Sequence, residues 1–294
     1  MATGNQTVTT ADKHIDTVEV DGVIRSLEFR IEIAKRVDRG WKFVGHGDTY
    51  QKTRIPNIAT QAKSASSGLN ATVYTDTNQT MSINVHDAAA IKHEHIAKVL
   101  SMNDVEGEMV KKMGYALARA IDVYLAALFA SFSQTVGTLG TELTVGNLMR
   151  AIRYLEDAGY EPDSDCTWFI SPAQKEALKQ VDSFSHADYV GDSTASDVTT
   201  RGKLMQTYQN VPIVITNLLN SPASGQHDNA LMAREMIALI MAQEPRILRE
   251  TIALDVADVT VSSQIYGASE IDRYSEAAGN ITATDEGAVW LKGV

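Results

Sequence analysis

A long run of apolar residues at helical spacing, from about Asn103 to Ser133, constrains the fold of this chain more than any other stretch. The residues of one stripe recur every three or four positions. They are Val105, Met109, Met113, Leu117, Ile121, Leu125 and Phe129. At about 1.5 Å per residue, the predicted helix would be a spine roughly 45 Å long. Other parts of the chain must therefore pack along all of it.

The size of the chain and its cysteine content limit the class of protein. With 294 residues it can bury a substantial core, as one large domain or two smaller ones. The single cysteine, Cys166, excludes an intrachain disulfide and favours a reducing compartment. Met1–Thr10 is polar and lacks the apolar core of a secretory signal. No apolar run approaches the ~20 residues that span a bilayer, so we expect a soluble intracellular protein without a membrane contact.

Charge is distributed unevenly along the chain. The first 100 residues hold 12 Lys and Arg against 11 Asp and Glu, a net charge of +1. Because the whole chain has a net charge of −11, residues 101–294 have a net charge of −12. The basic N-terminal region and the acidic remainder could attract one another between copies of the chain. A solvated helix face explains any one of these charges equally well, and the basic density is too low for a dedicated nucleic-acid-binding domain.

The N-terminal part predicts an arm followed by an extended loop. Met1–Lys13 is polar and is expected to gain structure only when it is bound, whereas Val23–Val37 has the apolar stripe of a helix. From Gly45 to Ser82 the chain has few large apolar residues, and its flanks, Thr49–Ile58 and Ala71–Val85, have the composition of strands. A two-stranded arm of this kind is marginal alone in water and needs a partner surface.

The C-terminal part predicts helices alternating with short buried strands. Thr144 is the expected N-cap of a helix over Val145–Ala158, and Ser171-Pro172 opens a further helix. Strands are expected at Cys166–Ile170, Val211–Ile215, Met236–Met241 and Thr251–Tyr266. The last of these alternates over a length unusual for one strand, which indicates an elongated framework.

One cluster contains metal-ligand residue types: His86, His93 and His95 with Asp87 and Glu94. In a strand, His93 and His95 would share a face that zinc could use. No cysteine lies nearby and no third ligand is defined, so we interpret these residues as surface or lightly packed histidines.

No arrangement in the sequence meets the requirements of catalysis. Glycine-rich phosphate loops, nucleophile elbows and Cys-x-x-Cys motifs are absent. Ser171 precedes a proline that indicates a helix cap, and Cys166 lies in an apolar run. The carboxylate pairs Glu156-Asp157 and Asp163/Asp165 fall at a helix end and a turn. We therefore predict no catalytic, cofactor-binding or metal-binding residues, no cofactor and no enzymatic activity.

The order of these parts resembles the major capsid protein of tailed bacteriophages, whose HK97-like fold is shared with encapsulin shells. The residues that carry the resemblance are Leu143–Pro162, Trp168–Ala173, and Gly202-Lys203 followed by Val211–Asn217. In that family, the helix–strand–Ser-Pro–helix run and the valine-proline strand belong to the axial domain. The resemblance covers nearly the whole chain.

The resemblance implies an α+β fold in four parts. Residues 1–44 would be the N-terminal arm and helix, 45–84 the extended E-loop, 85–139 with 251–266 the peripheral domain, and 140–250 with 267–294 the α/β axial domain. The peripheral domain would contain the spine helix and a long β-strand. The E-loop would lie across one neighbouring subunit and the arm would wrap another.

The function implied by the resemblance is structural. Copies of the chain would assemble as hexamers and pentamers into an icosahedral shell around a double-stranded DNA phage genome. The shell would form in the host cytoplasm and remain in the virion. Further partners would be a portal and decoration proteins. Some members of the family begin with a helical scaffolding domain, whereas this chain starts at the arm, so a full-length sequence would imply a separate scaffolding protein or none. The net charge of −11 suits weak, non-specific contact with packaged DNA.

Two alternatives and one chemical question accompany this interpretation. An encapsulin-type compartment would enclose an enzyme cargo in place of a genome, and a soluble metal-dependent α/β enzyme would use the histidine cluster. Lys63 is the obvious lysine for the isopeptide crosslink that some members of the family form. No matching asparagine or catalytic glutamate is identified, so we predict no crosslink.

Overall fold

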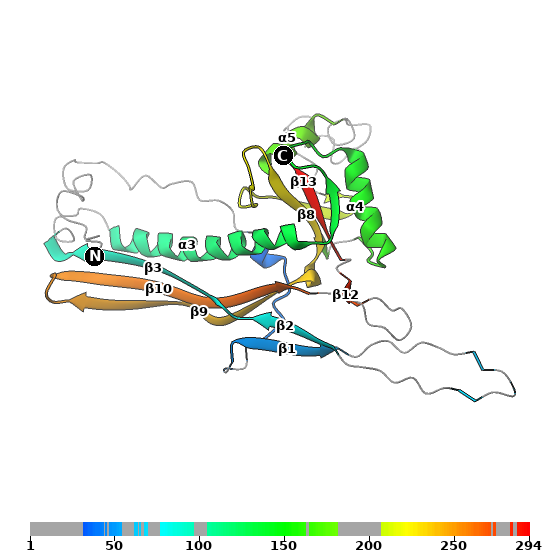
Figure 1. Cartoon of the computed structure of the whole chain (residues 1–294). Helices are drawn as coiled ribbons and strands as arrows, with labels where there is room; N and C mark the ends of the chain where they lie inside the picture. The colour runs from blue at the N-terminus through cyan, green and yellow to red at the C-terminus, as the bar shows by residue number, and fades with distance from the viewer. Residues whose placement is uncertain are drawn as a thin grey trace.

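The computed structural model describes residues 32–43, 45, 47–54, 62–63, 65, 68–69, 77–96, 105–162, 165–181, 207–271, 273–274, 283–284 and 287–294. These residues form an elongated half, a compact half and a projecting hairpin (Figure 1). The elongated half is one long helix along a three-stranded sheet, and the compact half is a six-stranded sheet with two shorter helices. The expected mixture of helices and sheets is confirmed.

The long helix is α3, Val105–Ala127, which continues into the 3₁₀ turn η2, Leu128–Ser131. These bounds confirm the helix predicted between Asn103 and Ser133. Buried residues recur four positions apart along its length. They are Met113, Leu117, Ile121 and Leu125. Gln264 of the sheet donates its Nε2 to the carbonyl oxygen of Leu117 at 2.9 Å, which joins helix and sheet away from solvent.

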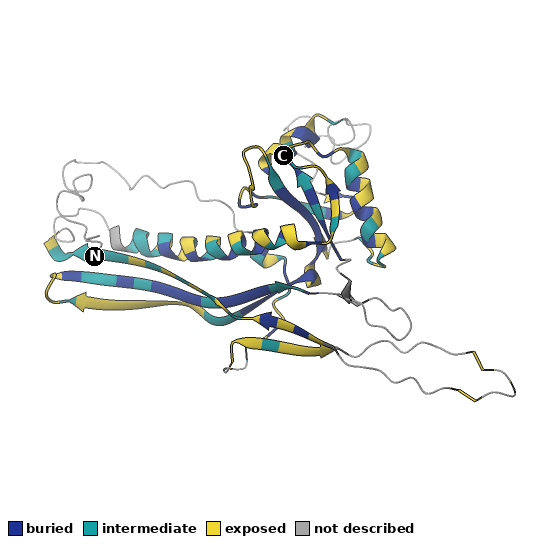
Figure 2. Ribbon diagram, in the orientation of Figure 1, coloured by how far each residue is buried: buried dark blue, intermediate teal, exposed yellow. Residues whose placement is uncertain are grey.

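The sheet beside α3 has the strand order β3-β10-β9, and all neighbours are antiparallel. Its strands are β3, Val85–Glu94, β9, Ile237–Ile252, and β10, Ala257–Glu270. The central strand β10 is mostly buried, whereas the second half of the edge strand β9 is exposed (Figure 2). The sheet and the helix form two long, thin layers. Few residues are buried between them at the end that carries the β9–β10 turn.

The long strand predicted over Thr251–Tyr266 is confirmed from Ala257 onward, where it is most of β10, and is wrong before that residue. β9 ends at Ile252, a turn follows, and β10 begins at Ala257. The four turn residues include no glycine, proline or asparagine, and Val256 takes a φ of 45° that β-branched residues rarely adopt. The one turn-favouring residue, Asp255, is therefore a weak sequence signal for this turn. The strand predicted over Met236–Met241 is the beginning of the much longer β9.

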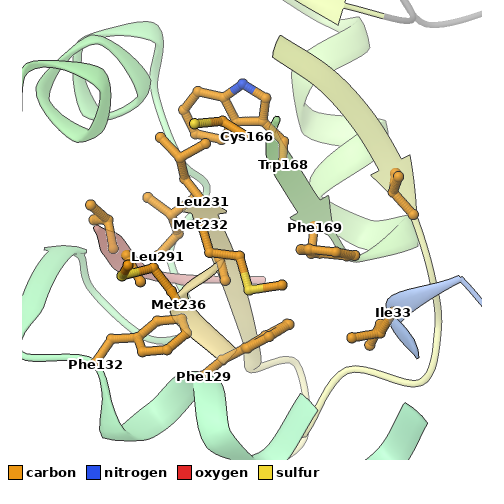
Figure 3. Packing of buried hydrophobic residues seen from close by; sticks show 14 of the residues in the cluster. Ile33, Phe129, Phe132, Cys166, Trp168, Phe169, Leu231, Met232, Met236 and Leu291 are labelled. Atoms are coloured by element: carbon orange, nitrogen blue, oxygen red, sulfur yellow. The ribbon is translucent and has the colours of Figure 1, made fainter. Parts of the chain in front are cut away.

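The six-stranded sheet has the order β4-β13-β8-β5-β7-β6. Its strands are β4, Gln134–Gly137, β5, Cys166–Ile170, β6, Thr207–Tyr208, β7, Val211–Ile215, β8, His227–Ala233, and β13, Ala288–Gly293. Phe169 of β5 packs against Phe129 of η2, with ring centroids 5.4 Å apart (Figure 3). The end of the spine helix is therefore part of the core of the compact half.

Two capped helices complete the compact half, α4, Val145–Asp157, and α5, Pro172–Lys179. The Thr144 hydroxyl accepts from the backbone N–H of Asn147 at 3.3 Å, and that of Ser171 accepts from Gln174 at 3.0 Å. Both predicted N-caps are confirmed, as are the strands predicted over β5 and β7. The short elements η4, β11 and β12 cover Arg234–Met236, Arg273–Tyr274 and Ala283–Thr284.

The predicted N-terminal elements lie mostly outside the described residues, including the whole arm Met1–Lys13. The part of the predicted helix Val23–Val37 that is described contains only the 3₁₀ turn η1, Ile33–Lys35. That helix therefore does not extend as an α-helix to Val37. After the turn, Asp38 forms a parallel bridge with Ala238 of β9, which fixes the segment to the long sheet.

The projecting hairpin consists of β1, Thr49–Arg54, and β2, Thr77–Ser82, in antiparallel register. These strands lie within the predicted extended flanks Thr49–Ile58 and Ala71–Val85. Residues 55–58 and 71–76, which belong to the same predicted flanks, lie outside the described part of the chain. The hairpin leaves the sheet at an angle and extends away from both halves (Figure 1).

Candidate assembly surfaces

A small apolar cluster fixes the base of the hairpin to the long sheet. Its buried members are Trp41, Met81, Ala238, Ile240 and Ile271. The rings of Trp41 and Tyr50 lie 5.3 Å apart, and the Nζ of Lys52 lies 4.9 Å from the centre of the Trp41 ring. These contacts hold the first residues of the hairpin against the long sheet.

Beyond this base most of the described hairpin is polar and exposed, apart from Gln79, which is buried and donates its Nε2 to the carbonyl oxygen of Glu270 at 3.3 Å. Gln51, Lys52 and Thr53 of β1 are all exposed. On β2 exposed residues alternate with buried ones, with Asn78 and Thr80 exposed (Figure 2). Within the described residues, β1 pairs with β2 and with no other strand. A two-stranded ribbon without a core of its own gains stability when it lies on another surface. The hairpin is therefore a candidate contact with another molecule.

The far end of the elongated half presents apolar side chains to solvent. Leu254 is 97% exposed at the β9–β10 turn, and Val256 and Ile96 are 59% and 53% exposed. The turn is held in place, because Asp255 forms an ion pair with Lys92 and the His95 backbone N–H donates to the Val256 carbonyl at 3.0 Å. Apolar side chains held rigidly in water are typical of a contact surface.

The structure places the members of the histidine cluster apart from one another. His86 and His93 lie seven positions apart on β3 and therefore on opposite faces of that strand. His95 follows the strand, and its Nε2 lies 3.1 Å from Oδ1 of Asp258. In the part of the chain that the structure describes, no group of three or more His, Cys, Asp or Glu side chains is placed to hold a metal ion.

The other residues that were considered for catalysis have structural roles or lie at exposed positions. Ser171 is buried, and its hydroxyl caps α5 and donates to the carbonyl oxygen of Val294. Cys166 is buried in β5. Of the carboxylate pairs, Glu156 is exposed and Asp157 pairs with Arg153 at 3.1 Å, whereas Asp163 lies outside the described residues. None of these residues is brought together with another to form a reactive arrangement in the described structure.

Sequence reasoning missed Asp122, a fully buried carboxylate in the middle of α3. It accepts hydrogen bonds from the backbone N–H groups of Glu32, Ile33 and Ala34 at 2.8, 3.1 and 2.8 Å. Burial raises the pKa of Asp122 above its ordinary value, the three hydrogen bonds oppose this, and the charge of Glu32 adds to it. One charged residue at a buried position of an apolar helix was the available signal.

The expectation that no segment could span a bilayer needs a correction. Residues Gly107–Ser131 are long and apolar enough to do so by length and composition alone. In the fold, this segment packs on the sheet through its buried stripe, and Asp122 in its middle binds backbone groups of another segment. The apolar character of α3 is accounted for by its role as the core helix.

The model of a family described as phage capsid protein matches residues 99–273, which is more than half of the chain. No curated protein sequence matches it. Among solved structures, a chain of Mycobacterium phage Che8 is 14% identical with a TM-score of 0.75, and the match covers 94% of this chain and 96% of that one. The capsid of Cyanophage P-SCSP1u matches at 15% identity and a TM-score of 0.74, covering 97% and 94%.

A capsid chain of a native GTA particle matches at 13% identity and a TM-score of 0.65, covering 95% of this chain and 94% of that one. At such identities the likeness establishes the fold, and the expected HK97-like capsid fold is confirmed. Neither the family match nor these structures favour an encapsulin-type compartment or a metal-dependent enzyme.

The family match suggests what the exposed hairpin and the apolar tip, which consists of Leu254, Val256 and Ile96, are for. Phage capsid proteins are structural components of the virion that assemble into a shell of many subunits, and they are not enzymes. The chain belongs to the phage capsid protein family and is a structural major capsid protein of a tailed phage.

Proposed function

We propose that copies of this chain form the hexamers and pentamers of an icosahedral shell that encloses a double-stranded DNA phage genome. The observation that carries the proposal is the projecting hairpin β1–β2, which is anchored at its base and exposed beyond it. A subunit with such an arm completes its contacts only on a neighbour. Many modest contacts, multiplied by symmetry, then stabilise the closed shell.

The expected division into four parts is retained in the proposal with one adjustment. Residues 1–44 form the arm, 45–84 the E-loop, 85–139 and 251–266 the peripheral domain, and 140–250 and 267–294 the axial domain. A boundary at 250/251 would divide β9, which pairs with β10 along most of its length. The boundary at 266/267 would divide β10 in the same way, so we assign the whole of β9 and β10 to the peripheral domain.

The apolar tip of the peripheral domain is the second proposed contact between copies. Leu254 is almost fully exposed, and the turn that carries it is fixed by Lys92 and His95. The tip lies at the opposite end of the molecule from the compact half (Figure 1). It is therefore suited to reach subunits that the compact half does not touch.

The other proposed partners follow from the assembly of a phage shell. The shell would form in the host cytoplasm with a separate scaffolding protein, join a portal and receive decoration proteins. Packaged DNA would be contacted weakly and without sequence preference, since a net charge of −11 disfavours tight binding to phosphates.

Deletion of Lys52–Asn78 with a two-glycine connection tests the role of the hairpin. We expect the variant to fold but to form no closed shells, because the removed segment supplies contacts to a neighbour and little to the subunit core. Negative-stain microscopy measures assembly, and near-UV circular dichroism with thermal unfolding shows whether the remainder is folded. Normal particles from the folded variant would contradict the proposal.

A further inference from the structure

The long sheet has one backbone edge that no other strand of the described chain occupies. β9 pairs with β10 on one side, and on its other side the described residues show one contact, the bridge from Asp38 near its start. From Glu244 to Thr251 every residue of β9 is exposed (Figure 2). Two of these residues are apolar, since Ile247 and Leu248 are 50% and 51% exposed. An exposed edge of this kind is a template for a further strand.

The exposed residues of β9 divide between the two faces of the sheet. Along β10, Gln264 lies on the face that α3 covers, and Val261, three positions before it, lies on the opposite face. Leu248 lies opposite Val261 in the ladder, so its side chain also points away from α3. Arg246 and Glu250, two positions to either side of Leu248, share this outer face. The outer face of the edge therefore carries a basic, an apolar and an acidic side chain in succession.

This succession is complementary to a second copy of itself. When two identical strands pair antiparallel, the hydrogen-bond pattern requires the numbers of facing residues to have a constant, even sum. With Leu248 opposite Leu248 of the second copy, Arg246 faces Glu250 of that copy, and Glu250 faces its Arg246. Opposite charges and apolar side chains that face each other across strands stabilise the pairing.

The other registers of the stretch Arg246–Glu250 bring like charges together. Centring the pair on either arginine of the stretch or on its glutamate would place a charge against itself. Centring it on Ile247 would place Glu244 against Glu250 of the second copy. Of the five possible centres in this stretch, Leu248 alone avoids such pairs. Pro245, which lies in the irregular step of the β9–β10 ladder and has no N–H to donate, ends the stretch.

We propose that two copies of the chain join their β9 strands edge to edge, antiparallel and centred on Leu248, so that one continuous sheet runs through both copies. The inference rests on the proposed shell and names one contact within it. The two-fold axis of such a pair is perpendicular to the joined sheet, so both α3 helices lie on the same face. Neighbours within one hexamer or pentamer meet head-to-tail, so this contact joins one hexamer or pentamer to the next.

A single introduced cysteine tests the register. Shells of Leu248→Cys should give a disulfide-linked dimer on a non-reducing denaturing gel after mild oxidation, because facing residues of antiparallel strands have Cα atoms about 4.5–5.5 Å apart. Glu250→Cys is the matched control, since its two copies would lie about 13 Å apart along the strands and should stay reduced. Cys166, the one native cysteine, is buried in β5 and does not compete.

Mixed shells extend this test to the charged positions. Subunits with Arg246→Cys and subunits with Glu250→Cys should form dimers when they are assembled together, whereas neither variant should do so alone. The proposal is overturned if Leu248→Cys shells give no dimer, or if Glu250→Cys alone links as readily. Absence of shells, hexamers and pentamers from the native chain would instead contradict the proposed function. Shells that form without the Leu248→Cys link would contradict the β9 contact alone.

An exchange of charges gives a second readout without cysteines. Arg246→Glu and Glu250→Arg each place like charges opposite one another, so each variant should form hexamers and pentamers but lose closed shells. The double variant restores opposite charges at the same positions and should recover closed shells. Sedimentation separates shells from hexamers and pentamers. A double variant that closes no better than the single variants would overturn the proposed register.

Discussion

Asp122 shows why a buried charge can persist in the core of this fold. The 3₁₀ turn η1 begins with backbone N–H groups that have no partner within the turn, and the Asp122 carboxylate accepts three of them. Each buried donor left without a partner would cost about 1–3 kcal/mol. The desolvation of the carboxylate opposes this gain, which is why its pKa is raised by burial despite three hydrogen bonds.

The raised pKa of Asp122 has a consequence for the pH dependence of stability. A carboxyl group with a raised pKa binds a proton more readily in the folded chain than in the unfolded one. Its contribution to stability is therefore present below the unfolded pKa of about 3.9 and is lost as pH rises through the folded value. Asp122→Asn removes this titration.

We expect the free energy of unfolding of the native chain, minus that of Asp122→Asn, to decrease from pH 4 towards neutral pH. Urea unfolding of unassembled subunits at several pH values measures the difference. Asp157→Asn, at an exposed position paired with Arg153, is measured alongside as the control variant. If the native chain instead gains stability relative to Asp122→Asn towards neutral pH, the pKa of Asp122 is not raised by folding.

Residue-scale prediction from sequence succeeded where the partner is near in the chain. Thr144 and Ser171 were identified as helix caps because each bonds the N–H three positions ahead. Asp122 was missed because its partners lie 88–90 positions away. No local pattern specifies such a pairing.

At the scale of elements, a close backbone crossing sets the direction of the hairpin. Gly267 of β10 lies where the chain passes from β2 to β3, and a Cβ at this position would overlap the carbonyl oxygen of Ser82 and lie 2.9 Å from Cα of Ile83. Both neighbours are backbone atoms, which cannot rotate away. The crossing therefore requires glycine.

We expect Gly267→Ala to lower the free energy of unfolding by at least about 1–3 kcal/mol, the usual cost of overpacking. Thermal or urea unfolding measures the change. Gly114→Ala is the matched control, because a Cβ there meets nothing within 4 Å and alanine favours the helix by about 0.5–1 kcal/mol. A Gly267→Ala variant as stable as the native chain would show that the crossing can relax.

The error over Thr251–Tyr266 has a physical cause at the same scale. β9 and β10 belong to one sheet, so the alternation of side chains continues from one strand into the next. The turn between them has a single turn-favouring residue, Asp255, and no glycine, proline or asparagine. Val256 is held at a positive φ by tertiary contacts, including the hydrogen bond from the His95 backbone N–H to its carbonyl.

At the scale of the whole molecule, the spine helix and the hairpin could be predicted from sequence. The helix has an unusually long apolar stripe, and the hairpin has few apolar residues to bury. The polar hairpin indicated a partner surface outside the chain, and the spine helix indicated an elongated framework along which other parts of the chain pack. What sequence alone does not give is the position of the exposed apolar tip, since Leu254 is surrounded by residues typical of a buried strand.

Substitution of Leu254 tests the tip as a contact between copies. Burying a leucine contributes about 1.5–3 kcal/mol, so Leu254→Asp should weaken association about tenfold or more while leaving subunit stability unchanged. Leu254→Met, which keeps the apolar contact, is the control and should assemble normally. Particle yield by sedimentation measures the effect, and equal yields from both variants would exclude the tip as a contact.

The central claim, assembly into a shell, is tested most directly by negative-stain microscopy of the purified full chain, with light scattering on the same sample. We expect closed shells, or hexamers and pentamers that close with a scaffolding protein. A species that stays at the 32.0 kDa of one chain at every concentration, with or without that protein, would contradict the account.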